Sequence, residues 1–170
     1  GGYTIDRAMY YSIVYSNNEV SYAMQKHLFG GRADYHDDYR RLIAQYSGLD
    51  PDSLGEEYFR DNCFTPRYMI NTLAYLYDHA SDYDTVIGLM KQAHPGRYFR
   101  LYEGDYEIAH KYGYYEGELN DCAIVFTPTP FLLTAFTKNV SNAEQILGEL
   151  CSLMTDYALT LSFGEPDAPE

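Results

Sequence analysis

The chain has 170 residues, of which 46% are hydrophobic, and its formal net charge is −13. This length and apolar content suit one folded domain with its own core, and they exclude a disordered chain. The acidity excludes nucleic acid and anionic membranes as main partners, because such contacts need clustered Lys and Arg. We find neither an apolar run of about 18 residues nor a signal-peptide pattern, so we expect no membrane contact.

The first half of the chain is predicted to be helical. Apolar residues recur at helical spacing over about 4–15, 19–29, 34–47, 65–77 and 81–90. Thr4 and Thr65 are placed to cap the first and fourth of these helices, and Pro66 follows in the favoured order. We expect the inner side of the first helix to carry Ile5, Ala8, Met9, Ser12 and Ile13. That of the second should carry Val20, Met24 and Leu28.

Two polar segments interrupt these helices. Ser16-Asn17-Asn18 forms a corner, because such side chains compete for backbone groups and favour turns and caps. The second segment is the long connection over 49–64, and a loop of that length inside a compact domain is typical of functional segments. It holds an acidic group that we interpret as a hydrated loop rather than as paired catalytic carboxylates: Asp50, Asp52, Glu56 and Glu57.

The second half predicts a three-stranded antiparallel meander covered by a helix. Strands are expected over 106–112, 120–127 and 131–137, because these runs are rich in β-branched, aromatic and apolar residues. Ser141 and Glu144 have the spacing of a capping box, and apolar residues then repeat at helical intervals to Ala158. The fold class is therefore α+β, with one domain over 1–163 and a frayed tail over 164–170.

The three cysteines are Cys63, Cys122 and Cys151. They are too few and too scattered for a disulfide framework, and an odd number leaves at least one thiol unpaired. Cys122 and Cys151 lie in a strand and a helix that should pack together, so a bridge is open, although buried thiols are favoured. No His-Glu-x-x-His spacing and no phosphate-binding glycine loop is found, so we expect neither a metal nor a cofactor.

Two small motifs carry the functional hypothesis. A Ser-x-Asn corner, Ser16 to Asn18, lies between two helices, and Lys111-Tyr112-Gly113 lies on the first strand of the meander. With the closing C-terminal helix, this order resembles the class A serine β-lactamases and the penicillin-binding D-alanyl-D-alanine peptidases, whose motifs are Ser-x-x-Lys, Ser-Asp-Asn and Lys-Thr-Gly. The similar stretches are 10–20, 108–113 and 120–125. The resemblance implies an incomplete β-lactamase/transpeptidase-like fold that comprises the C-terminal two-thirds of a family domain.

The resemblance also implies roles for individual residues. Ser16 would relay the proton to the leaving nitrogen, and Asn18 would hold the lysine of the first motif and the substrate amide. Lys111 would supply positive charge near the substrate carboxylate, as the catalytic cation of the Lys-x-Gly strand. Tyr112, Gly113 and Tyr114 would bind substrate, with the backbone N–H of Tyr114 as one oxyanion donor.

The sequence also departs from the family pattern. No serine is followed three residues later by a lysine, so the nucleophile is absent and this polypeptide alone should not acylate. Asn17 replaces the usual Asp, and Tyr112 replaces the hydroxyl-bearing Thr or Ser. No Glu-x-x-x-Asn pair precedes Thr65, so the deacylating glutamate has no counterpart.

The leading hypothesis is therefore part of an extracytoplasmic serine acyl-transfer enzyme. Its ligands would be β-lactams or peptidoglycan-like peptides, and its partner would be the missing N-terminal segment of the same domain. The first alternative is a non-catalytic binding or structural module on the same fold, which the Tyr112 replacement favours. The second alternative is an unrelated helical interaction domain in which both motifs are ordinary caps and strand ends.

Overall fold

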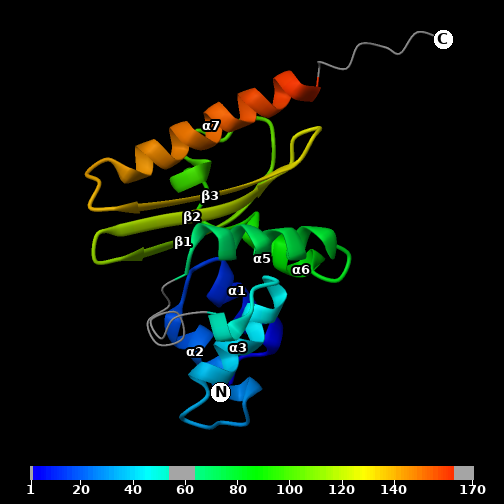
Figure 1. Cartoon of the computed structure of the whole chain (residues 1–170), viewed down its shortest axis with the longest axis vertical. Coiled ribbons are helices and arrows are strands. Elements are labelled where there is room, and N and C mark those ends of the chain that lie inside the picture. The colour runs from blue at the N-terminus through cyan, green and yellow to red at the C-terminus, as the bar shows by residue number, and fades with distance from the viewer. Residues whose placement is uncertain (1, 54–63, 163–170) are drawn as a thin grey trace, which may run out of the picture. The chain divides into compact units, whose positions relative to one another are not determined.

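The computed structural model describes residues 2–53 and 64–162 of the chain (Figure 1). It divides into two compact units, Gly1–Leu89 and Met90–Glu170. The first unit is built from helices, and the second from one antiparallel sheet with a helix over it. The prediction of one domain over 1–163 stays a prediction, and the tail over 164–170 lies outside the described residues.

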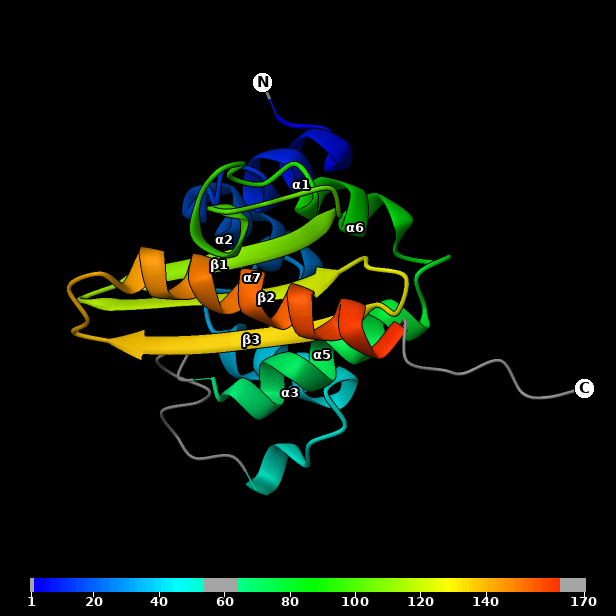
Figure 2. The same ribbon diagram turned by 90° about the horizontal axis from the view of Figure 1, so that it is seen from above.

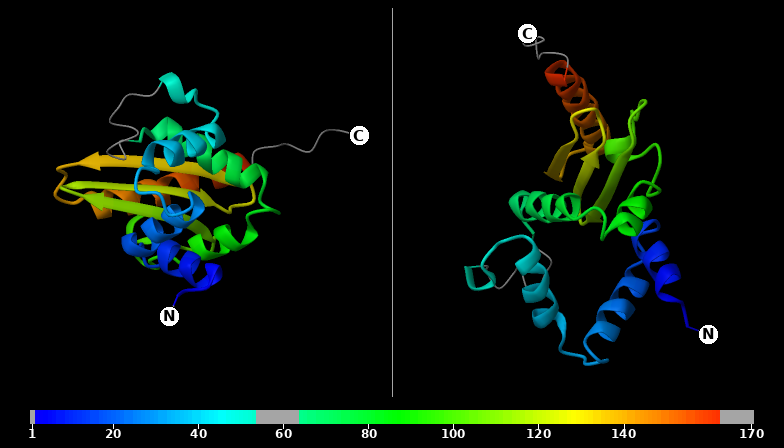
Figure 3. Two further views of the ribbon diagram at one scale, coloured as in Figure 1. Left: turned by 90° about the horizontal axis from the view of Figure 1, so that it is seen from below. Right: turned by 90° about the vertical axis from the view of Figure 1, so that its right-hand side faces the viewer.

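In the first unit, two helices form a pair joined by the polar corner. α1 spans Ile5–Ile13 and α2 spans Asn18–Leu28, which appear as neighbours in blue in Figure 3. The Thr4 side chain accepts a hydrogen bond from the Arg7 N–H, so the predicted cap is confirmed. The hydroxyls of Ser12 and Ser21 lie 2.6 Å apart and join the two helices.

The other helices of this unit also follow the sequence closely. α3 spans His36–Tyr46, the 3-10 turn η1 spans Pro51–Ser53, α5 spans Pro66–Asp78 and α6 spans Asp84–Met90. Thr65 caps α5 by accepting a hydrogen bond from the Tyr68 N–H, as predicted. Buried Ala44 and Tyr68 form the centre of a small core between α3 and α5, and Asn71 donates to the Ser47 carbonyl at 2.9 Å.

The second unit contains the predicted meander. Its sheet has the order β1-β2-β3, with β1 at Ile108–Tyr115, β2 at Glu118–Val125 and β3 at Phe131–Lys138. All pairs are antiparallel. The β1–β2 turn uses Glu116 and Gly117, which both have positive φ, as a two-residue type I′ turn requires. A short 3-10 turn, η2, spans Tyr98–Arg100 ahead of the sheet.

One long helix covers a face of this sheet. α7 spans Ala143–Ser162 and runs along the strands (Figure 2). Leu147 and Cys151 of α7 are buried against Phe99 of η2 and against one face of the strands. Because side chains alternate across a strand, Ile108, His110 and Tyr112 share this covered face, whereas Lys111 lies on the opposite face.

The structure corrects several details of the predicted helices. Leu28 and Ile5 are 63% and 70% exposed rather than inward, because both lie at the ends of α1 and α2 far from the corner that joins them. The helix predicted over 34–47 begins at His36 and buries Arg40 and Ala44, while Tyr46 is 41% exposed. The helix predicted from Ser81 begins at Asp84.

The strand and cap predictions are corrected in the second unit. β1 begins two residues later than predicted and continues to Tyr115, because the two-residue turn pairs Tyr115 with Glu118. The predicted capping box is not the interaction that Glu144 makes in the structure. Its carboxylate accepts hydrogen bonds from the guanidinium of Arg97, which ties the start of α7 to the segment before η2.

Candidate active site

The polar corner places Ser16 and Asn18 at the start of α2. Asn17 is the residue that caps the helix, with its side-chain oxygen 3.0 Å from the Val20 N–H and its N–H bonded to the Tyr11 carbonyl. Ser16 is half-buried and has a φ of 55°, a left-handed conformation that is costly for a non-glycine residue. Asn18 is exposed. The local fold therefore holds these two side chains on either side of a well-bonded cap.

Lys111 lies in the middle of β1, the first strand of the described sheet. Its side chain is half-buried, and its ammonium donates to the Tyr112 carbonyl at 3.0 Å. Burial lowers the pKa of Lys111, and the electrostatic influence of the neighbouring Cys122 and Asp121 side chains opposes that shift. The Cys122 thiol donates to the Lys111 carbonyl at 3.3 Å. A cation is thus held close to the strand by its own backbone.

The ladder between β1 and β2 fixes the direction of the backbone groups beside Lys111. The Phe126 N–H donates to the Glu107 carbonyl at 3.0 Å, and these residues are opposite each other in the register. Hydrogen-bonded and non-bonded pairs alternate in an antiparallel ladder, so Lys111 and Gly113 bond to β2. The N–H groups of Tyr112 and Tyr114 therefore point away from β2, toward the outer edge of β1.

Gly113 and Tyr114 leave this edge accessible. Apart from Gly113 itself and its two chain neighbours, no residue of the described chain has an atom within 4 Å of a Cβ built at Gly113, and the Tyr114 side chain is 69% exposed. An outward N–H beside an exposed side chain can donate to a ligand carbonyl or oxyanion. The sequence predicted this donor, and its direction follows from the ladder.

Sequence reasoning missed the aromatic surroundings of Tyr112. The Tyr98 ring stacks on the Tyr112 ring with centroids 4.3 Å apart, and the His94 ring meets it edge-on at 4.6 Å. The Lys111 ammonium lies 4.8 Å from the Tyr112 ring centre, and the Arg97 guanidinium lies 5.0 Å from the Tyr98 ring centre. We call Lys111, Tyr112, Tyr98 and Arg97 the aromatic ladder, because the two rings stack between two cations.

A buried hydrogen-bonded pair, His110 and Asp121, holds the segment that carries Arg97 and Tyr98 of this ladder. His110 Nδ1 lies 2.8 Å from Asp121 Oδ2, and both side chains are fully buried. His110 Nε2 lies 2.8 Å from the Ala93 carbonyl, and Asp121 accepts the Phe99 N–H at 3.0 Å. The pair therefore fixes both ends of segment 93–99, which carries His94, Arg97 and Tyr98. The sequence of this segment contains His94-Pro95-Gly96, which ends a helix but does not indicate these contacts.

The Ser-x-Asn corner and the Lys-x-Gly strand lie in different units. Ser16 and Asn18 belong to Gly1–Leu89, and Lys111, Tyr112, Gly113 and Tyr114 belong to Met90–Glu170. The second group is assembled on one strand, whereas its approach to the first group stays a prediction.

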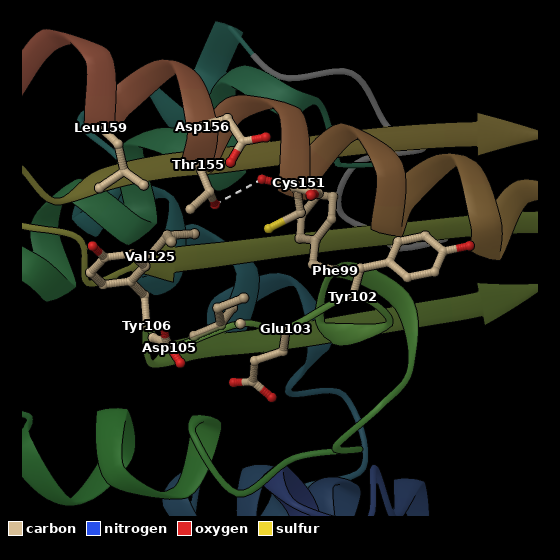
Figure 4. A pocket seen from close by; sticks show the side chains of 13 residues that line it. Phe99, Tyr102, Glu103, Asp105, Tyr106, Val125, Cys151, Thr155, Asp156 and Leu159 are labelled. Atoms are coloured by element: carbon tan, nitrogen blue, oxygen red, sulfur yellow. Dashed lines mark hydrogen bonds between the residues drawn. The ribbon is translucent and has the colours of Figure 1, made fainter.

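A separate cavity of about 140 Å³ lies beneath α7 (Figure 4). Its apolar wall includes Phe99, Val125 and Leu159, and Thr155 donates to the Cys151 carbonyl at 2.8 Å within it. Because the cavity opens on the covered face of the sheet, it lies on the face opposite Lys111. None of Lys111, Tyr112 and Gly113 lines this cavity.

The remaining candidates of the sequence analysis have ordinary partners. Asp52 pairs with Arg41, and Asp50 accepts the Asp52 N–H at 3.0 Å, while Glu56 and Glu57 lie outside the described residues. Cys122 and Cys151 are buried free thiols rather than a disulfide, and Cys63 is not described. Within 2–53 and 64–162, no three acidic, His or Cys side chains gather as metal ligands would. No helix in those ranges is long and apolar enough to span a membrane.

Solved β-lactamases have a similar fold. The chromosome-encoded β-lactamase of Vibrio parahaemolyticus superposes with a TM-score of 0.70 at 17% identity, over 92% of this chain and 65% of that one. The β-lactamase of Sphaerobacter thermophilus gives 0.69 at 21% identity, over 98% and 65%. PBP-A gives 0.69 at 14% identity, over 91% and 61%. At these identities the likeness establishes the β-lactamase-like fold.

The chain spans less than two-thirds of the length of these three structures. A variant of PBP-A was solved as an acyl-enzyme complex with penicillin G. No curated protein matches the chain in sequence. The model of the Beta-lactamase2 family, described as the β-lactamase enzyme family, matches residues 2–158. That match covers nearly all of the chain, which therefore belongs to the β-lactamase enzyme family.

Proposed function

We propose that the chain is the C-terminal part of a serine β-lactamase-like hydrolase that acts by acyl transfer on β-lactams or peptidoglycan-like peptides outside the cytoplasm. The observation that carries the proposal is the edge of β1 in a member of this family. There a half-buried ammonium, Lys111, lies on the same strand as the outward N–H of Tyr114. A ligand that has a carboxylate and an acyl carbonyl needs these two groups.

Each residue has a proposed role in binding or acyl transfer. Lys111 attracts the ligand carboxylate, and the Tyr114 N–H stabilises the negative charge that develops on the carbonyl oxygen. Ser16 passes a proton to the leaving nitrogen, and Asn18 holds the amide of the ligand. The printed sequence contains no Ser-x-x-Lys, so the nucleophile must come from the N-terminal segment of the same domain. These 170 residues alone should bind ligand without acylation.

Ligand binding by this chain is the first test. Titration of the ¹⁵N-labelled chain with penicillin G should shift the amide resonances of Lys111 to Tyr114 more than those of other described residues. Lys111→Met keeps the apolar stem and removes the charge, so it should weaken binding about 10- to 100-fold, as expected for a charge-assisted hydrogen bond. Unchanged spectra at millimolar penicillin G would contradict the proposal.

Covalent chemistry requires the longer parent protein. Its intact mass should increase by one penicillin G after incubation with the drug, and Ser16→Ala should slow the appearance of this adduct. The chain described above should show no mass increase under the same conditions. An unmodified parent after long incubation at millimolar drug would leave no support for acyl transfer.

The second candidate function is a non-catalytic binding module on the same fold. It is favoured by Tyr112, whose ring takes the place of a short hydroxyl and packs against Tyr98. A binding module should take up penicillin G reversibly, with an affinity that Ser16→Ala does not alter. The adduct measurement on the parent therefore separates the two functions.

A further inference from the structure

The middle residue of the Lys-x-Gly strand is a tyrosine with a specific set of neighbours. A short hydroxyl at this place could donate directly to a ligand carboxylate. The Tyr112 ring is instead half-buried against the core beneath α7 and stacks on Tyr98 at an interplanar angle of 17°. Burial, followed by the neighbouring Tyr112 side chain, raises the pKa of Tyr98 to about 12. The Tyr112 ring is thus held against Tyr98.

The ring, by contrast, contacts a cation. The Lys111 ammonium lies 4.8 Å from the Tyr112 ring centre, within the range of cation–π attraction. At the other end of the stack, the Arg97 guanidinium lies 5.0 Å from the Tyr98 ring centre and is also bonded to Glu144. The two stacked rings therefore connect the motif lysine to a second cation that the sequence motif does not contain.

Neighbouring residues hold the stacked rings of Tyr98 and Tyr112 in place. His94 and Tyr98 have φ values of 35° and 55°, and such left-handed residues persist only where neighbouring structure fixes them. That structure is the buried pair of His110 and Asp121, which binds the Ala93 carbonyl and the Phe99 N–H at the two ends of the segment. The His94 ring also meets the Tyr112 ring at an interplanar angle of 79°.

We propose that Tyr112 acts through its ring rather than its hydroxyl, as a positioning residue that holds the Lys111 ammonium and, through Tyr98, the Arg97 guanidinium for recognition of a ligand carboxylate. This proposal rests on the proposed function of the β1 edge. Two cations in fixed positions lose little side-chain freedom when a carboxylate binds, so a rigid ladder favours carboxylate ligands over neutral ones.

Three substitutions of Tyr112 distinguish the contributions of its ring, its hydroxyl and its apolar bulk to ligand binding. Tyr112→Phe keeps the ring without the hydroxyl, Tyr112→Leu keeps apolar bulk without the ring, and Tyr112→Thr provides the short hydroxyl typical of the family. Each variant is titrated with penicillin G and, separately, with its methyl ester, which lacks the carboxylate charge. Tyr115→Phe and Tyr115→Leu are matched controls, because Tyr115 is on the same strand and is 70% exposed.

The ladder predicts a specific pattern of affinities. Tyr112→Phe should bind penicillin G within about twofold of the wild type, and Tyr112→Leu and Tyr112→Thr should bind it about 3- to 30-fold more weakly, the range of a cation–π contact. The methyl ester should bind equally to all of them. In the ligand-free chain, the Lys111 Hε resonances should keep their ring-current shift in Tyr112→Phe and lose it in Tyr112→Leu.

Any other pattern of affinities would contradict the proposed role of Tyr112 in the aromatic ladder. Tighter binding by Tyr112→Thr would make the tyrosine an impediment, and weak binding by Tyr112→Phe would make the hydroxyl the functional group. Equal losses for the acid and the ester would reduce Tyr112 to a packing residue. If the wild-type chain binds no penicillin G, the proposed function itself fails, whereas wild-type binding that Tyr112→Leu leaves unchanged refutes the ladder alone. Circular dichroism on each variant identifies any that does not fold.

Discussion

His110 on β1 and Asp121 on β2 form a fully buried pair, with 2.8 Å between Nδ1 and Oδ2. Both ring nitrogens of His110 face acceptors, because Nε2 points at the Ala93 carbonyl. Asp121 also accepts two backbone N–H groups, from Phe99 and Cys122. Both ring nitrogens and both carboxylate oxygens of this buried pair therefore have a hydrogen-bond partner.

The first prediction concerns this pair. Asp121→Ala and His110→Ala should each lower the free energy of unfolding by about 3–5 kcal/mol, because each leaves an uncompensated buried polar partner. Urea denaturation followed by circular dichroism measures the change. The double variant should cost less than the sum of the two single variants, since the second substitution removes the orphaned group. Strict additivity would show that the two side chains do not interact.

Alkaline pH should weaken the fold through Tyr98. Burial raises the pKa of Tyr98 from 10 to about 12, so in that window the unfolded chain releases a proton that the folded chain keeps. The free energy of unfolding should therefore fall as pH rises from about 10 to about 12. Tyr98→Phe should lack this component, so the difference between the two denaturation curves isolates it from the other tyrosines. A constant difference across this range would contradict the assigned shift.

His94 should contribute a stability change at the acidic side of neutrality. Burial, followed by the charge of Lys111, lowers the pKa of His94 below 6.5, so the unfolded chain takes up its proton first. The free energy of unfolding should hence decrease as pH falls below 6.5, and it should be highest above that value. His94→Gln should remove this component, and the His94 Hε1 resonance reports the titration directly. A midpoint above 6.5 in that titration would be the opposite result.

The two described cysteines should be unreactive in the folded protein. Burial raises the pKa values of Cys122 and Cys151 to about 12, and the thiolate is the reactive form. In a Cys63→Ser background, the folded chain should not react with a disulfide reagent at pH 8, and the same chain in denaturant should release two equivalents. Rapid labelling of the folded chain would contradict the burial of these thiols.

The turn between β1 and β2 should tolerate no side chain at Gly117. Its φ is 83°, and a Cβ there would lie 2.5 Å from the side-chain oxygen of Asn139. Gly117→Ala should cost at least about 1–2 kcal/mol, the penalty of a left-handed conformation with a Cβ. Gly113→Ala is the matched control for thermal unfolding, because open space surrounds it and its φ is not positive. Similar melting temperatures for both variants would argue against this turn geometry.

The features that depend on neighbours in sequence could be predicted from it. Thr4 and Thr65 bond to N–H groups three residues away, so a local pattern was sufficient to place both caps. The meander followed in the same way from alternating and apolar runs. The predicted end of β1, at residue 112, was too early. In the structure the two-residue turn at Glu116 and Gly117 pairs Tyr115 with Glu118, so β1 continues to Tyr115.

The features that depend on register and on unusual backbone geometry could not be predicted. His110 meets Asp121 only in one alignment of β1 with β2, and a slip of one residue would turn each side chain to the other face. The stack of Tyr98 on Tyr112 requires left-handed φ values at His94 and Tyr98, for which neither residue gives a signal. The prediction that Ser16 and Asn18 share a site with Lys111 stays open to the experiments above.

The outward amides of β1 have a chemical consequence for ligand length. Because successive outward groups of a strand are two residues apart, the amides of Tyr112 and Tyr114 lie roughly 7 Å from each other along it. A molecule that engages the carbonyl donor at one end and the cation beside Tyr112 at the other must separate its acyl carbon from its anionic group by a few bonds. Under the proposed function, this edge would therefore favour short ligands whose acyl carbon and anionic group lie only a few bonds apart.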